Sequence, residues 1–358
     1  MDGTYTEGQV AFRQGAISQP ITVRAQNKWK AILNSTADCN PAISVYASYI
    51  TIENLRISGT GRCTVYELRA ADAAIIPWEA QGPTISGTHS TGYVGFVARG
   101  LYIDAGRGLG IKVRQDNALV ENCEIHNSLE NFNNIGTIFR NNTTYGHDQF
   151  GSSIFAKGGS RNTLIYNNVV HLMGADWTEG ILLGGSSGVQ WDYDPATGIE
   201  CYNCVAYNNV VINETGNATG VLGMAGCQDC AMFNNIGING SLFMRGGGSG
   251  ATSRNPVWKN NILSCGNNSP TTSWAYVGTM AIDYNDIYCG GAPGQNHAIA
   301  GNPMFVNPAS DWHLQPGSPA LGSGVATPTT PAFGGGTLDT SKNTDGNVRT
   351  APWNLGIH

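Results

Sequence analysis

The stretch Ile165-Tyr166-Asn167-Asn168-Val169-Val170 is one copy of a pattern that recurs along the chain: apolar, any residue, Asn, any two residues, and usually an apolar residue. Its third-position asparagines are Asn54, Asn122, Asn141, Asn167, Asn208, Asn234, Asn260 and Asn285. Successive asparagines lie 68, 19, 26, 41, 26, 26 and 25 residues apart. A repeat unit of about 22–26 residues fits four of these seven gaps directly.

The content of each unit decides between a helical and a β solenoid. Short β-branched or aromatic runs alternate with Gly, Asn and Ser turns, and no 3.6-residue periodicity is visible. We therefore predict an all-β chain, a right-handed parallel β-helix of about 10–12 coils stacked about 4.8 Å apart. The gap of 68 fits three coils, and the gap of 41 fits one coil with an inserted loop at about 186–199.

The repeated asparagines have a structural explanation. Amides stacked at the coil spacing can hydrogen-bond along the column, and Asn tolerates the left-handed backbone of a tight turn. A second ladder of five-residue strands begins at residues 153, 180, 220 and 241. Alternation of side chains predicts one outward apolar column and one column next to it. The apolar column is Phe155, Leu182, Leu222 and Phe243, and the next is Lys157, Gly184, Met224 and Arg245.

The cysteines occur at the same spacing as the coils. Cys201-x-x-Cys204 and Cys227-x-x-Cys230 are offset by 26 residues, so each cysteine is expected beside its partner on the next coil. This favours disulfides Cys201–Cys227 and Cys204–Cys230 over a four-thiolate zinc site, the alternative interpretation. The pairs Cys39/Cys63 and Cys265/Cys289 follow the same logic, which leaves Cys123 as a buried thiol.

Composition narrows the classes of protein. The chain has 358 residues, 12% charged residues and a net charge of −6. With no basic run of five residues, we expect no nucleic-acid partner, and with no apolar stretch of 18 residues, no membrane span. Nine cysteines indicate an oxidising compartment. We expect a secreted monomer, with Met1 standing where a leader has been removed.

We divide the chain into a β-helix domain over residues 1–324 and a tail over 325–358 that packs along the helix or caps it. Residues 302–324 are interpreted as a last coil with a Pro/Gly-rich exit. The inserted loop carries Trp191, Asp192, Tyr193 and Asp194. Long loops on a rigid scaffold are where function usually resides.

Several motifs resemble those of a known group of proteins. Lys157-Gly158-Gly159-Ser160-Arg161-Asn162, the following Gly184-Gly185-Ser186-Ser187-Gly188, and the endings Trp312-His313-Leu314 and Ser318-Pro319-Ala320 resemble secreted right-handed parallel β-helix repeat proteins of the pectate-lyase-like superfamily. The resemblance covers nearly the whole chain. It implies a polysaccharide lyase that cleaves an acidic, uronate-containing polysaccharide by β-elimination.

The resemblance also assigns a base. In the alginate and chondroitin type of lyase a Lys base lies in a strand before a small-residue turn, which corresponds to Lys157 here. The Arg acid of that type lies one coil further on, where this chain has Gly184, and Arg245 is three rungs away. A non-catalytic glycan-binding protein and a glycoside hydrolase remain as alternatives. The hydrolase branch has a Gly-His-Gly turn where this chain has Gly146-His147-Asp148.

The residues themselves suggest further roles around Lys157. Lys112 lies ten residues before Asn122, as Lys157 lies ten before Asn167, so the two lysines are expected to share a column and form a basic patch. His147 beside Asp148 is a candidate acid or metal ligand. Further candidates for substrate contact are Arg161, Arg245, Trp191 and Tyr193. Asp192 and Asp194, with Glu179, are candidate ligands for Ca²⁺, the one cofactor suggested.

Overall fold

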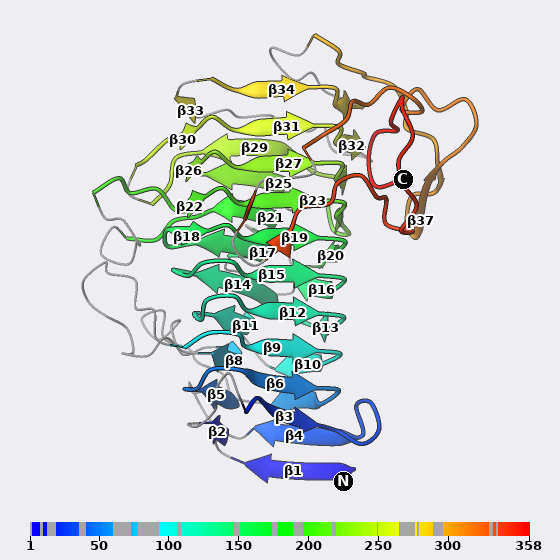
Figure 1. Ribbon diagram of the computed structural model, residues 1–358. Coiled ribbons are helices and arrows are strands. Elements are labelled where there is room, and N and C mark those ends of the chain that lie inside the picture. Colours follow the sequence, from blue (N-terminus) through cyan, green and yellow to red (C-terminus); the bar gives the residue numbers. More distant parts are fainter. Residues whose placement is uncertain are drawn as a thin grey trace.

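The computed structural model describes residues 2–7, 10–12, 19–35, 41–59, 73–77, 93–105, 109–146, 151–173, 178–188, 196–216, 220–248, 250–264, 276–277, 279–288, 296–328, 332–333 and 336–358. Over these residues the chain is a right-handed parallel β-helix, as predicted (Figure 1). Its rungs follow one another from the N-terminus at one end of the stack to β34 near the other.

Three parallel sheets run along the helix, with a short fourth sheet at one corner. Sheet A contains β1 (Gly3–Glu7), β4 (Ala31–Ser35), β7 (Arg56–Gly59), β10 (Tyr102–Ala105), β13 (Glu124–Ile125), β16 (Thr143–Gly146), β20 (Val169–Leu172), β24 (Val210–Asn213), β28 (Ile236–Ile238), β32 (Ile262–Ser264) and β35 (Asp286–Ile287). Sheet B contains β2 (Val10–Phe12), β5 (Ile43–Val45), β8 (Ala73–Pro77), β11 (Leu109–Val113), β14 (Ser128–Phe132), β17 (Gly151–Lys157), β21 (Thr178–Gly184), β25 (Gly220–Ala225) and β29 (Leu242–Arg245).

Sheet C contains β3 (Ile21–Arg24), β6 (Ile50–Glu53), β9 (Val97–Arg99), β12 (Leu119–Glu121), β15 (Ile138–Arg140), β19 (Leu164–Tyr166), β23 (Val205–Tyr207), β27 (Ala231–Phe233), β31 (Val257–Lys259) and β34 (Ala281–Asp283). The corner sheet contains β18 (Ser160–Arg161), β22 (Cys201–Tyr202), β26 (Cys227–Gln228), β30 (Ser253–Arg254) and β33 (Tyr276–Val277). Eleven described strands in sheet A agree with the expected 10–12 coils.

The two roles expected of the asparagines, the tight turn and the amide ladder, belong to two neighbouring positions. Third-position residues such as Asn167 have a positive φ, 55° in this case, as a tight turn requires. The continuous amide ladder, however, is formed by the fourth-position residues Asn142, Asn168, Asn209, Asn235 and Asn261, and it ends at Asn285. The third position is therefore not the source of the continuous ladder, although one of its pairs is bonded, with Asn260 Nδ2 donating to Asn234 Oδ1 at 3.0 Å. The fourth position is buried in the interior.

The second ladder is confirmed in outline but shifted at β25. Ile181 pairs with Leu222, and Leu182 pairs with Gly223, so Leu222 faces the core instead of the outer column. A Cβ at Gly223 would lie 2.1 Å from Phe243 Cζ, which shows that the Phe243 ring fills the outward place beside the glycine. The column next to it contains Lys157, Gly184, Ala225 and Arg245, with Ala225 where Met224 was predicted.

The C-terminal part of the chain lies outside the stack (Figure 1). Residues 302–324 were interpreted as a last coil, but they contain the antiparallel strands β36 (Phe305–Asn307) and β37 (Asp311–Leu314). A second antiparallel pair is β38 (Ala332–Phe333) and β39 (Gly336–Thr337). No helix among the described residues has the length and apolarity needed to cross a membrane.

Candidate functional site

We call residues 302–358 the C-terminal segment. It packs on the outer sides of sheets A and C, so we consider sheet B as the face for a functional site. Phe305, Leu355 and Ile357 pack on the outer side of sheet A, in a buried cluster with strands β24, β28 and β32. Leu338 packs on the outer side of sheet C against β19, β23 and β27. Among the described residues, no part of the C-terminal segment joins the apolar cluster on the outer side of sheet B.

A buried carboxylate on this face holds two lysines. Lys112 Nζ lies 3.5 Å from Glu130 Oε2, and Lys157 Nζ lies 3.5 Å from Glu130 Oε1. The side chains of Glu130 and Lys112 are 2% and 8% exposed, whereas that of Lys157 is 25% exposed. The basic patch expected from the sequence is therefore present, and Lys157 is its solvent-facing member.

The register of the two lysines differs from the prediction. Lys112 pairs with Glu130, which pairs with Phe155, so Lys112 belongs to the apolar outer column. Lys157 pairs with Phe132 and belongs to the neighbouring column. The shared column is therefore wrong, and Glu130, on the rung between them, is what brings the two amines together.

Arg114 and two aromatic rings complete this group. Phe132 has three cations around it, with Lys112 Nζ 4.7 Å, Arg114 Cζ 5.0 Å and Lys157 Nζ 6.0 Å from the ring centre. Lys157 Nζ also lies 5.1 Å from the centre of the Phe155 ring. We call Lys112, Arg114, Glu130 and Lys157 the cationic cluster. Its three cations lie around the Phe132 ring, and the rings stabilise part of their charge.

Burial changes the pKa values of two members of the cationic cluster. Loss of hydration lowers the pKa of Lys112 to about 8, although the charge of Glu130 opposes the shift. Burial alone would raise the pKa of Glu130, but the charges of Lys112, Lys157 and Arg114 outweigh it and hold that pKa below its usual value. Glu130 is therefore a counter-ion at neutral pH and not a proton donor.

The turn after Lys157 is fixed by a residue that the sequence did not reveal. Gly158 and Gly159 both have positive φ, and Gly158 N donates to Glu200 Oε2 at 3.0 Å. The other carboxylate oxygen of Glu200 accepts hydrogen bonds from Ser187 N and Gly248 N. Glu200 is fully buried, and the partners of its carboxylate within the described part of the chain are backbone amides from three rungs. Such partners have no side-chain signature, so no motif could have indicated them.

The two predicted substrate-binding arginines lie away from the cationic cluster. Arg245, three rungs from Lys157 as expected, pairs with Glu179 at 3.1 Å and donates to Ser186 Oγ at 2.7 Å. Arg161 lies in the corner sheet, beyond the Gly158–Gly159 turn, with its guanidinium 4.5 Å from the centre of the Tyr202 ring.

The remaining predicted site residues lie outside the described part of the chain. These are the candidate acid His147 with Asp148, the aromatic residues Trp191 and Tyr193, and the candidate Ca²⁺ ligands Asp192 and Asp194. Their roles stay predictions.

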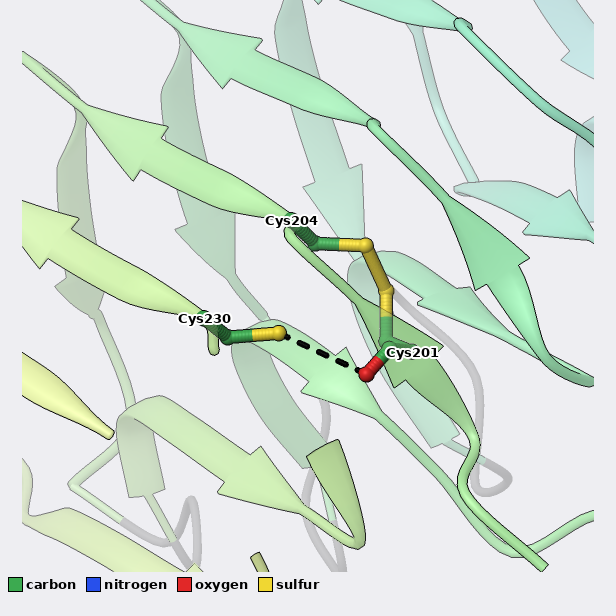
Figure 2. A group of neighbouring side chains, drawn as sticks. All are labelled: Cys201, Cys204 and Cys230. Carbon is green, nitrogen blue, oxygen red and sulfur yellow. Dashed lines mark hydrogen bonds between the residues drawn. A yellow bond between two sulfur atoms is a disulfide. The ribbon is translucent and has the colours of Figure 1, made fainter. Parts of the chain in front are cut away.

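The cysteine register was predicted correctly, but the bond was not. Cys201 pairs with Cys227 in the corner sheet, one rung apart. The disulfide nevertheless joins Cys201 to Cys204 within one coil, with Cα atoms 6.2 Å apart (Figure 2). Cys230 lies beside this bond and donates to the Cys201 carbonyl oxygen at 3.5 Å, as Figure 2 shows. Cys227, Cys230 and the buried Cys123 are free thiols. Cys39, Cys63, Cys265 and Cys289 lie outside the described residues.

Thiol labelling distinguishes the two pairings. We expect iodoacetamide, applied to protein unfolded without reductant, to label Cys123, Cys227 and Cys230 and to leave Cys201 and Cys204 unlabelled. Peptide mass spectrometry provides the measurement, and a reduced sample in which all these cysteines are labelled provides the control. A cross-linked peptide pair containing Cys201 and Cys227 would contradict the arrangement.

Comparison with known proteins supports the fold. No model of a known protein family and no curated protein sequence matches the chain. The solved Dettilon tailspike protein (gp208) aligns with a TM-score of 0.51 and 14% identity, over 83% of this chain and 61% of the tailspike. The GH136 lacto-N-biosidase from Eubacterium ramulus aligns with a TM-score of 0.46 and 13% identity, over 78% of this chain and 60% of that enzyme.

The catalytic unit of a GH87 alpha-1,3-glucanase from Streptomyces thermodiastaticus aligns with a TM-score of 0.44 and 11% identity, over 80% of this chain and 64% of that unit. This chain thus spans about three fifths of the length of each of these proteins. At 14% identity, the alignment with the tailspike shows a shared fold alone and does not single out the pectate-lyase-like superfamily.

Proposed function

We propose that this chain is an exported protein that acts on an acidic polysaccharide lying across the outer face of sheet B. The observation that carries the proposal is the cationic cluster. It gathers three cations around one buried carboxylate and beside two aromatic rings, on a chain whose net charge is −6. A local positive field on an acidic protein attracts the carboxylates of a uronate polymer.

We propose further that the reaction is β-elimination with Lys157 as general base. The reaction needs a group that takes the proton α to the uronate carboxylate and a positive field that stabilises the charge that develops. Lys157 is the amine of the cationic cluster that reaches solvent, so it suits proton removal. Lys112 and Arg114 are buried behind it and act through their charge. His147 or a tyrosine is the proposed acid.

A non-catalytic glycan-binding protein is the second candidate. The ion pair between Lys157 and Glu130 favours it, because a lysine held in an ion pair is placed to bind an anionic group of the polymer. A glycoside hydrolase has less support. The described strands of sheet B present Glu130 and Glu179 on their outer side, and both carboxylates are held in ion pairs.

A panel of polysaccharides tests the proposal. Purified protein is incubated with polygalacturonate, alginate, chondroitin sulfate and a neutral glucan, with and without chelator, and assayed for unsaturated and for reducing ends. We expect ultraviolet-absorbing unsaturated ends from at least one acidic polymer. We expect Lys157→Gln to slow their formation by about 10²–10⁴-fold, the usual contribution of a general base.

The control is Lys259→Gln, the same change on sheet C, which should leave the rate within about twofold of wild type. Unsaturated ends formed at the wild-type rate by Lys157→Gln would exclude Lys157 as the base. Reducing ends without unsaturation would identify a hydrolase. Retention of an acidic polymer without any turnover would identify the binding protein.

A further inference from the structure

Two histidines and an aspartate converge at the C-terminal segment, away from the cationic cluster. His313 belongs to β37, and Asp345 and His358 belong to the tail. His313 Nε2 lies 3.3 Å and His358 Nδ1 lies 3.1 Å from the same atom, Asp345 Oδ2. One donor atom from each residue lies within 4.8 Å of the other two. Two imidazoles thus face one carboxylate oxygen from different segments of the chain.

A second carboxylate orients one of these imidazoles. His313 Nδ1 lies 2.6 Å from Asp311 Oδ1, on the side of the ring opposite Asp345. With the Nδ1 proton donated to Asp311, the lone pair of the neutral ring is on Nε2 and faces His358 and Asp345. Histidine ligands of metal ions almost always have such an outer partner, which fixes the tautomer and strengthens the ligand.

Hydrogen bonds to the backbone of His358 and of its neighbour fix the position of the other imidazole. Arg349 Nη1 donates to the His358 carbonyl oxygen at 2.9 Å, and Thr344 N donates to the carbonyl of Ile357 at 3.1 Å. Ile357 itself is buried against sheet A. The His358 side chain is only 11% exposed. Its position is therefore fixed by the packing of the tail and does not depend on Asp345 alone.

The two rings lie face to face. Their centres are 3.6 Å apart and their planes differ by 20°, so each ring can turn one nitrogen toward the same oxygen of Asp345.

We propose that His313, Asp345 and His358 bind a divalent transition-metal ion of the zinc class, with Asp311 as the outer partner of His313. Two imidazole nitrogens and one carboxylate oxygen are ligands that Zn²⁺ prefers, with water as a fourth ligand. Ca²⁺ prefers six to eight oxygen ligands and does not fit this set. The ion would join the hairpin β36–β37 to the end of the tail, next to Ile357, which is buried against sheet A.

Calorimetry with ZnCl₂ tests the proposal on the full chain without a polyhistidine tag. We expect one Zn²⁺ per chain, no heat with CaCl₂, and a higher melting temperature with zinc, because a ligand of the folded state stabilises it. His313→Ala should abolish the zinc-dependent rise in melting temperature. Asp311→Asn, which keeps all three ligands, should weaken zinc binding by about 10–100-fold.

The matched control is His297→Ala. His297 is also an exposed histidine paired with a carboxylate, Asp283 at 2.8 Å, but it is not a member of this group. Circular dichroism verifies that each variant is folded. A wild-type protein that binds no zinc, or zinc binding unchanged in His313→Ala, would overturn the proposal. So would sulfur ligands in the X-ray absorption spectrum of the zinc-loaded protein, which would place the ion at the cysteines.

Discussion

Replacing Glu130 by glutamine is expected to lower the free energy of unfolding by about 3–5 kcal/mol at pH 7. Glutamine has nearly the same shape, so the packing of sheet B is preserved while its counter-charge is lost. Glutamine cannot neutralise the two lysines that Glu130 pairs with, and the side chain of one of them, Lys112, is almost fully buried. Removing one partner of a buried ion pair costs far more than the pair contributes in water.

The pH dependence of this loss follows from the two shifted pKa values. Glu130 has a lowered pKa, so its stabilising contribution is complete above its usual value of 4.5 and is lost as the pH falls through the lower folded value. Lys112 has a lowered pKa of about 8, so its buried charge costs stability below pH 8, and this cost disappears as the pH rises toward 10.5. The difference between wild type and Glu130→Gln should therefore be largest near neutral pH.

Urea unfolding followed by circular dichroism at pH 4, 7 and 9.5 measures the effect. Glu179→Gln is the matched control, since Glu179 is also on sheet B but pairs with one arginine whose side chain is 38% exposed. We expect that change to cost about 1 kcal/mol or less. Equal losses in the two variants, or a Glu130→Gln loss that does not vary with pH, would show that Glu130 does not neutralise a buried group of cations.

The fold was predictable because its signal repeats. A coil that recurs every 22–26 residues gives many observations of one structural unit, and errors in single coils do not change the result. The position of the amide ladder was harder to predict, since most copies have Asn at both the third and the fourth position. The last copy has a single Asn, and only the structure shows which of the two roles it has. Tyr284 has the positive φ of the turn, and Asn285 accepts the hydrogen bond of the amide ladder.

The errors within the fold arise from interactions between rungs. At β25 the outward place beside Phe243 is Gly223, and the ring compensates for the missing side chain. Alternation of side chains along the strand therefore predicted Leu222, and not Gly223, in the outward apolar column. The cysteines show the same limit, because Cys204 and Cys227 both lie near enough to Cys201 for a disulfide. Spacing alone could not choose between them.

The candidate site was predictable in its lysines but not in what holds them. Lys112 and Lys157 share an offset from their asparagines, and this was sufficient to place them on one face. Glu130 and Glu200 belong to no motif. Glu130 lies on the rung between those of the two lysines, and Glu200 binds backbone amides. The His313, Asp345 and His358 group joins segments with no repeat relation, so sequence spacing gave no indication of it.

Substituting alanine for Asn168 is expected to cost about 3–5 kcal/mol, because several buried polar groups lose their partners together. The Asn168 side chain accepts hydrogen bonds from Asn142 N and Asn142 Nδ2 and donates to Asn209 Oδ1 and to the carbonyls of Phe139 and Tyr166. Alanine can replace none of these bonds, and Asn168 is 1% exposed. Urea unfolding gives the free energy change, with the slope of the transition showing whether unfolding remains cooperative.

Asn167→Gly is the control that isolates the ladder. Asn167 is the adjacent residue, its side-chain oxygen has no hydrogen-bond partner among the described residues, and glycine adopts its φ of 55° without strain. We expect that change to cost less than about 1 kcal/mol. If the two substitutions cost the same, the asparagines would be needed only for their turn conformation. If Asn168→Ala alone is costly, the hydrogen-bonded amides hold adjacent coils in register, and the positions of Lys112, Glu130 and Lys157 relative to one another depend on them.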